Sequence, residues 1–157
     1  MNIKKLVIAI AIPLGVGSIA GYATSSNIKS WFTTLVQPSF APPNWVFAPV
    51  WTTLYILMGI ALYLVWSKPA VNHWHKKAIT IFAIQLVLNF CWSFIFFEFH
   101  QLGLAMFEIG MLWVAIFLNI LVFAKISKTA AWLLVPYIMW VSFASILNFY
   151  YWSLNTV

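Results

Sequence analysis

The sequence predicts an all-α integral membrane protein, a bundle of five transmembrane helices in a single domain over residues 1–157. Hydrophobic residues make up 64% of the chain and charged residues only 6%, whereas about a quarter of a soluble domain is charged. Mean hydropathy is +0.97, so the chain lacks the polar side chains that would cover a water-facing surface. Long intervals with almost no charge, each near the ~20 residues that cross a bilayer as a helix, complete the prediction.

Five such intervals follow one another, at about residues 6–24, 45–66, 78–97, 102–124 and 129–152. Polar joints separate the last four, and Ser127 or Thr129 offers an N-cap for the last interval. The fourth contains Glu108, which either pairs with a neighbouring helix, faces water in a cavity or relays protons.

The first interval begins after Lys4 and Lys5, as a secretory signal peptide does. Its apolar run of about 19 residues is long enough to span a membrane, so we count it as a helix. Pro13 lies inside this helix, and Gly15 and Gly17 are expected to let a neighbouring helix approach closely.

The connection over residues 25–44 is the long one. Pro38, Pro42 and Pro43 exclude a continuous helix there, and the aromatic Trp31 makes the segment too apolar for a solvated linker. We therefore expect it to fold onto the protein as a lid.

Seven of the eight lysines fall on one side when the five spans alternate across the bilayer, and the exception is Lys29. These seven are Lys4, Lys5, Lys68, Lys76, Lys77, Lys125 and Lys128. The positive-inside rule then predicts a cytoplasmic N-terminus and an external C-terminus, in a bacterial cytoplasmic membrane. Such lysines also attract anionic membrane lipids. The absence of arginine argues against a nucleic-acid partner, and the lone Cys91 excludes a disulfide scaffold.

Three spans each carry aromatic and polar side chains at helical spacing. These are Trp51, Tyr55, Met58 and Gly59 in the second, Gln85, Asn89, Trp92, Ser93 and Phe96 in the third, and Trp140, Ala144, Leu147, Asn148 and Tyr151 in the fifth. Three such inward faces predict an aromatic pocket for a small molecule. Asn89 and Asn148 have a second interpretation, because intramembrane amides also hydrogen-bond across helices as structural contacts.

The tryptophans fall into two groups by depth. Trp45, Trp66, Trp74, Trp132 and Trp152 lie near span ends and are expected to anchor the membrane interface. Trp51, Trp92, Trp113 and Trp140 lie deeper, where an indole N–H needs a partner. Each deep tryptophan serves either the pocket or core packing.

Three ordered blocks of residues closely resemble the TspO/MBR family, which comprises tryptophan-rich sensory proteins and mitochondrial translocator proteins (peripheral benzodiazepine receptors). The first block runs from Trp31 through Pro42-Pro43-Asn44-Trp45 to Trp51, Tyr55 and Met58-Gly59, the second contains Gln85, Asn89 and Trp92-Ser93, and the third contains Pro136-Tyr137, Trp140, Phe143-Ala144 and Leu147-Asn148.

This resemblance implies a receptor or binding protein for porphyrins such as protoporphyrin IX, usually a homodimer, with a loop that closes the cavity. Carried onto this chain, it implies a ligand-binding set of Trp51, Tyr55, Asn89, Trp92, Trp140, Phe143, Ala144, Leu147 and Asn148, with lid residues Pro42, Pro43 and Trp45. Animal members carry a sterol-recognition pattern near the end of the last helix. Here no basic residue follows Tyr150, which argues against a sterol ligand.

Conventional catalysis is not expected. His73, His75 and His100 fall in connections, so we expect neither a metal site nor a cofactor. The resemblance adds an enzymatic alternative, the light- and oxygen-dependent breakdown of bound porphyrin with Trp51 and Trp140 as electron donors. A porphyrin or sterol transporter is the third alternative, although the sequence shows no inverted repeat.

Overall fold

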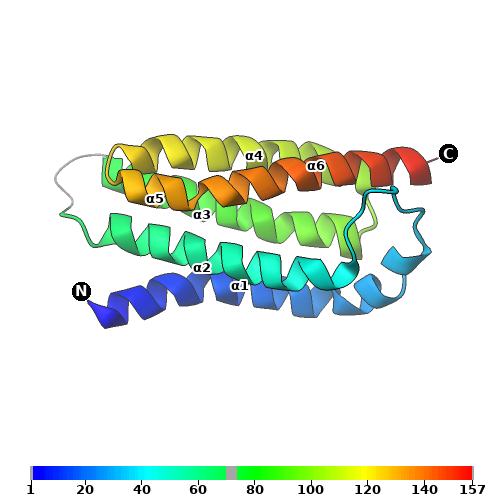
Figure 1. The fold of residues 1–157 in the computed structure, drawn as a ribbon, viewed down its shortest axis with the longest axis horizontal. Helices are drawn as coiled ribbons and strands as arrows, with labels where there is room; N and C mark the ends of the chain where they lie inside the picture. The colour runs from blue at the N-terminus through cyan, green and yellow to red at the C-terminus, as the bar shows by residue number, and fades with distance from the viewer. Residues whose placement is uncertain (1, 70–73, 157) are drawn as a thin grey trace.

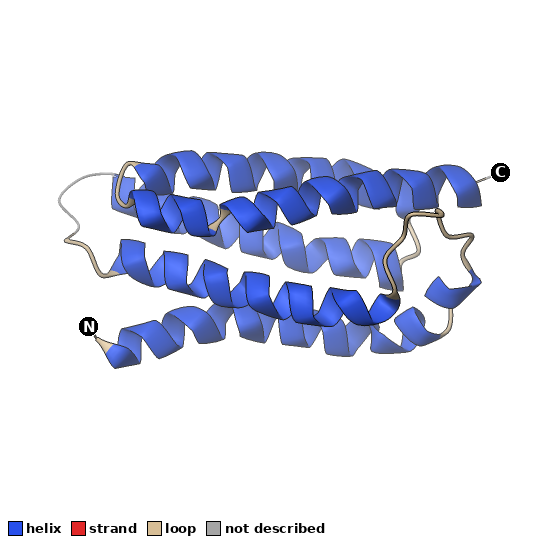
Figure 2. Cartoon of the chain, viewed as in Figure 1, coloured by secondary structure: helices blue, strands red, loops and turns tan. Residues whose placement is uncertain are grey.

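The computed structural model describes residues 2–69 and 74–156. Its helices are α1 (Ile3–Lys29), α2 (Phe47–Trp66), α3 (Trp74–Ser93), α4 (Leu102–Ala124), α5 (Lys128–Leu133) and α6 (Val135–Asn155). They lie side by side along the long axis of the molecule (Figure 1). No strand occurs in the described ranges (Figure 2).

Five stretches of the described residues are long and apolar enough to cross a membrane, as predicted: Ile3–Lys29, Asn44–Trp66, Trp74–Glu98, Leu102–Ala124 and Lys128–Asn155. The third includes a π-helical turn, Phe94–Glu98, that continues α3. The fifth consists of α5 and α6, which are separated at Leu134. Pro136 lies in the first turn of α6, where a backbone N–H is not needed. Within one continuous helix, the same proline would remove a backbone hydrogen bond and interrupt the helix.

The end of α1 differs from the expected boundary. The helix continues to Lys29, and the hydroxyls of Ser25 and Ser30 donate to backbone carbonyls one turn earlier, at 2.8 Å from Tyr22 O and Ser26 O. These bonds keep the serines compatible with the helix. The long connection is therefore shorter than expected and begins only at Ser30.

The segments that carry seven of the eight lysines, all except Lys29, lie together at one end of the bundle, which we call the lysine-rich end (Figure 1). The backbone N–H of Asn2 donates to the Tyr63 hydroxyl at 3.1 Å, so the N-terminus lies beside the end of α2. Lys68 Nζ donates to the carbonyl of Ile126 at 2.9 Å, which joins the connection after α2 to that after α4.

Glycines allow α1 and α2 to pack closely. A Cβ added to Gly59 would overlap the backbone of Ile10, and one added to Gly17 would overlap the ring of Tyr55. The close approach expected at Gly17 is therefore present, whereas a Cβ on Gly15 would meet nothing within 4 Å. The helix pair depends on two backbone positions without side chains.

The segment between α1 and α2 crosses the other end of the bundle toward α6 before it returns (Figure 1). Phe32 is buried, with its ring centroid 5.2 Å from that of Tyr151. The Asn155 side chain accepts from Val36 N at 2.8 Å and donates to Val36 O at 3.0 Å. The segment is thus tied to the last turn of α6.

Candidate functional site

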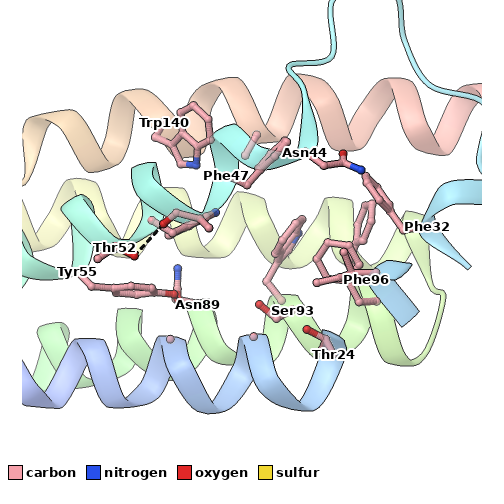
Figure 3. A pocket seen from close by; sticks show the side chains of 18 of the residues that line it. Thr24, Phe32, Asn44, Phe47, Thr52, Tyr55, Asn89, Ser93, Phe96 and Trp140 are labelled. Atoms are coloured by element: carbon pink, nitrogen blue, oxygen red, sulfur yellow. Dashed lines mark hydrogen bonds between the residues drawn. The ribbon is translucent and has the colours of Figure 1, made fainter. Parts of the chain in front are cut away.

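A cavity of about 460 Å³ lies between α1, α2, α3 and α6, in the half of the bundle away from the lysine-rich end (Figure 3). Small-molecule sites commonly have volumes of this order. The lining residues are Leu14, Gly17, Ser18, Gly21, Thr24 and Ile28 of α1; Phe32 and Asn44 of the connection; Phe47, Ala48, Trp51, Thr52 and Tyr55 of α2; Asn89, Trp92, Ser93, Phe96 and Phe97 of α3 and its π turn; and Trp140, Ala144, Leu147, Asn148 and Tyr151 of α6.

The cavity is lined by buried side chains on one side and by exposed residues on the other. Its α3 and α6 walls contain buried side chains, namely Asn89, Phe96, Ala144, Leu147, Asn148 and Tyr151. Exposed lining residues belong to α1, to the end of the connection and to the beginning of α2: Ser18, Gly21, Asn44, Ala48 and Thr52. A guest would therefore lie against α3 and α6 and be covered least between α1 and α2.

Aromatic rings dominate the walls and support one another. Trp51 stacks on Tyr55 with ring centroids 5.5 Å apart. Phe47 meets Trp140 edge-on at 5.8 Å, and Trp92 lies 5.0 Å from Phe96. Rings held in this way present rigid apolar surfaces to a guest.

Both predicted amides make interhelical hydrogen bonds. Asn89 Oδ1 accepts from the Tyr55 hydroxyl at 2.7 Å, and Asn89 Nδ2 donates to the Tyr137 hydroxyl at 3.0 Å. These bonds connect α2, α3 and α6 at the bottom of the cavity.

Asn148 has the same kind of role. Its Oδ1 accepts from Trp92 Nε1 at 3.1 Å, and its Nδ2 donates to the carbonyl of Leu102 at 2.9 Å. The structural interpretation of these amides is therefore correct, although both also lie on the cavity wall.

Trp140 differs from Trp92 in its indole nitrogen. Nε1 of Trp140 is buried and has no hydrogen-bond partner within residues 2–69 and 74–156. Figure 3 shows this nitrogen on the side of the ring that faces the cavity. By contrast, the hydroxyl of Thr52 is already used, since it donates to Ala48 O at 2.8 Å (Figure 3). Trp140 thus supplies an unused donor to the interior of the site.

The sequence has known counterparts. A sequence profile of the TspO/MBR family matches residues 9–153. The chain belongs to the TspO/MBR family.

Relatives within TspO/MBR are similar over nearly the whole chain. The tryptophan-rich protein TspO of Chlorobaculum tepidum is 44% identical over 160 residues, which cover 97% of this chain and 99% of the relative. A protein of the same name from Archaeoglobus fulgidus is 41% identical, with 99% of each chain covered. The translocator protein of Homo sapiens is 37% identical over 80% of this chain and 75% of its own. Together with the five apolar helices, family membership identifies an integral membrane protein.

Eight of the nine residues that the TspO/MBR resemblance assigned to ligand binding line the cavity: Trp51, Tyr55, Asn89, Trp92, Trp140, Ala144, Leu147 and Asn148. Phe143 does not. It packs against Trp140 with ring centroids 5.6 Å apart and against Phe40 at 6.5 Å. Phe143 therefore borders the site and supports one of its walls.

The expected lid residues lie beside the cavity and do not line it. Pro42, Pro43 and Trp45 are absent from its wall, to which the same stretch of chain contributes Asn44 and Phe47. Trp45 is 75% exposed, as an indole at a membrane interface would be.

The α1 wall was missed by the sequence analysis. Its residues are small or apolar, and none of them suggests chemistry. The only signal in the sequence is their spacing, because Leu14, Gly17, Gly21, Thr24 and Ile28 recur every three or four residues and so share one face of a helix.

Glu108 lies in α4, away from the cavity, and is 3% exposed. Neither carboxyl oxygen has a hydrogen-bond partner in the described part of the chain, so the interpretation as an interhelical pair is not supported.

Residues 2–69 and 74–156 contain no group of three histidine, cysteine or acidic side chains that could hold a metal ion. His75 lies in the first turn of α3 and not in a connection, whereas His73 lies outside the described residues.

Proposed function

We propose that this TspO/MBR protein binds a planar apolar molecule of the tetrapyrrole class, such as protoporphyrin IX, in the aromatic cavity. The observation that carries the proposal is the unpartnered indole N–H of Trp140 on a largely aromatic wall. A buried donor without an acceptor costs about 1–3 kcal/mol. A ligand with a flat macrocycle and polar edge groups would fill the space and supply the acceptor.

The rings of Trp51 and Trp92 are the proposed stacking surfaces. Each aromatic pair contributes about 1 kcal/mol beyond the burial of apolar area, and the burial itself supplies most of the affinity. Micromolar binding is the expected result. Asn148 holds the ring of Trp92 through a direct hydrogen bond. Asn89 acts on Trp51 indirectly, because it bonds to Tyr55, on which Trp51 stacks.

Trp140→Phe tests the proposal. The change removes Nε1 and keeps an aromatic ring, so we expect the fold to persist and the dissociation constant for protoporphyrin IX to rise about threefold to tenfold. The measurement is quenching of tryptophan fluorescence as protoporphyrin IX is titrated into the purified protein. Trp51→Phe is expected to weaken the quenching as well.

Trp132→Phe is the matched control, because Trp132 is 72% exposed and does not line the cavity. It should leave the dissociation constant unchanged. Unaltered quenching in both the Trp51→Phe and Trp140→Phe proteins would contradict the assignment of the site.

The segment of residues 30–46 is the proposed lid, with Pro42, Pro43 and Trp45 at its return to α2. Phe32 and Asn44 already form part of the cavity wall. The two hydrogen bonds between Val36 and Asn155 hold the segment over α6, and their release is the proposed opening step.

Photochemical breakdown of the bound porphyrin is the second candidate function. It is favoured by the indoles of Trp51, Trp92 and Trp140, which line the same cavity from three helices, so that an excited macrocycle would lie beside electron-rich rings. Illumination of the protein with protoporphyrin IX in air would then bleach the porphyrin, and Trp51→Phe with Trp140→Phe would slow the bleaching. If the protein binds the porphyrin without degrading it, the porphyrin bleaches no faster with the unmodified protein than with the Trp51→Phe/Trp140→Phe double variant.

A bacterial cytoplasmic membrane, with the lysine-rich end toward the cytoplasm, is the proposed location. This orientation follows from the positive-inside rule.

A homodimer is the proposed assembly. Three small residues near the helix ends pack within the chain, because Ala78 and Ala105 are completely buried and a Cβ on Gly103 would lie 3.1 Å from Trp152. Ala83 and Gly110 are exposed and remain available for a contact between copies.

A further inference from the structure

A second cavity, of about 370 Å³, lies at the lysine-rich end between the end of α2 and the first turns of α3. We call it the basic crevice. It is lined by Trp66, Lys68, His75, Lys76, Ile79 and Thr80. None of these residues belongs to the aromatic cavity.

We propose that the basic crevice binds the phosphate headgroup of an anionic phospholipid. The first reason is charge. Lys68 and Lys76 both line it, and the two acidic residues of the sequence, Glu98 and Glu108, lie elsewhere. Glu98 accepts from Asn27 at the opposite end of α1. A phosphate would therefore meet two cations with no carboxylate to compete for them.

The second reason is unused hydrogen-bonding capacity. Both ring nitrogens of His75 are buried and have no partner among the described residues, and His75 lines the crevice. Lys68 uses one N–H on the Ile126 carbonyl, which leaves two of its three donors.

The third reason distinguishes a lipid from a free anion. The crevice combines polar groups with the apolar surfaces of Ile79, which is 38% exposed, and Trp66, which is 39% exposed. Ile79 lies one helical turn further into the span than His75. The ring of Trp66 is also covered by Lys5, whose Nζ lies 5.5 Å from the ring centroid. Phosphate at the polar end and acyl chains along the apolar end match this arrangement.

Native mass spectrometry of the purified, delipidated full chain tests the proposal. The probes are phosphatidylglycerol and phosphatidylcholine with the same acyl chains. We expect the unmodified protein to retain phosphatidylglycerol preferentially. Lys76→Gln removes one charge from an exposed side chain and should lower this preference roughly fivefold. His75→Phe, which keeps a planar aromatic ring and removes both nitrogens, should lower it too.

Lys128→Gln is the matched control, since Lys128 is an exposed lysine at the same end but outside the crevice. It should leave the preference intact. An equal loss in this variant, or full retention by His75→Phe, would overturn the site in favour of diffuse surface charge. Millimolar inorganic phosphate should not displace phosphatidylglycerol; displacement would show a free-anion site and overturn the lipid assignment.

Discussion

Ala144→Phe is expected to weaken protoporphyrin IX binding at least tenfold while the protein still folds. Ala144 lies on the deep α6 wall of the cavity and is 9% exposed. A phenyl group at this position would project into the empty space and occupy the volume that the proposed ligand needs. Because the cavity offers room of about 460 Å³, the ring does not have to displace the core, as an added ring in a filled interior would.

The measurement is the same fluorescence titration, accompanied by a thermal unfolding curve. Ala83→Phe is the matched control, because Ala83 is an exposed alanine of α3 that does not line the cavity. It adds the same phenyl group to the lipid-facing surface and should leave binding unchanged. Tight porphyrin binding by a folded Ala144→Phe protein would place the ligand somewhere else.

Gly59→Leu is expected to lower the apparent unfolding midpoint by about 5 °C or more. Even a Cβ at Gly59 would overlap the backbone of Ile10, and backbone cannot rotate away as the end of a side chain can. The substitution must therefore push α1 away from α2. Since both helices line the cavity, porphyrin binding should fall as well.

Gly110→Leu provides the comparison for this stability experiment. Gly110 lies in α4, and a Cβ there would meet nothing within 4 Å. The midpoint of the Gly110→Leu protein should equal or exceed that of the unmodified protein, because helix propensity favours leucine over glycine. If the two variants unfold at the same temperature, close packing at Gly59 does not stabilise the bundle.

Span positions could be predicted from the sequence because the bilayer imposes a length and an apolar composition on every helix. The prediction for α4 agrees with the structure at both ends, Leu102 and Ala124, where polar residues adjoin the apolar run. The ends of α1 and α3 were less predictable. α1 runs on to Lys29 through serines whose hydroxyls bond to the helix backbone, and a π turn extends the third span to Glu98.

Most of the cavity could also be anticipated, since amphipathic spacing selects the face of each helix that turns inward. Asn89 and Trp140 show where this reasoning stops. Both residues carry an N–H donor on the inward face that the sequence predicts. The amide of Asn89 is hydrogen-bonded to two tyrosines, whereas the indole N–H of Trp140 has no partner among the described residues. Which buried polar group is left for a ligand depends on distances between different helices, and spacing along one helix cannot supply these.

Composition and hydrophobic pattern alone determined that this chain is a five-span membrane bundle with aromatic faces inside, because those properties are local and are imposed by the solvent. The tertiary structure decided that α1 completes the cavity and that Phe143 stands outside it. It also brought Lys68, His75 and Lys76 to one crevice. The cavity wall arises from the packing of segments far apart in the chain, and the crevice from the way α2 and α3 lie against each other. Both depend on where neighbouring backbones come close.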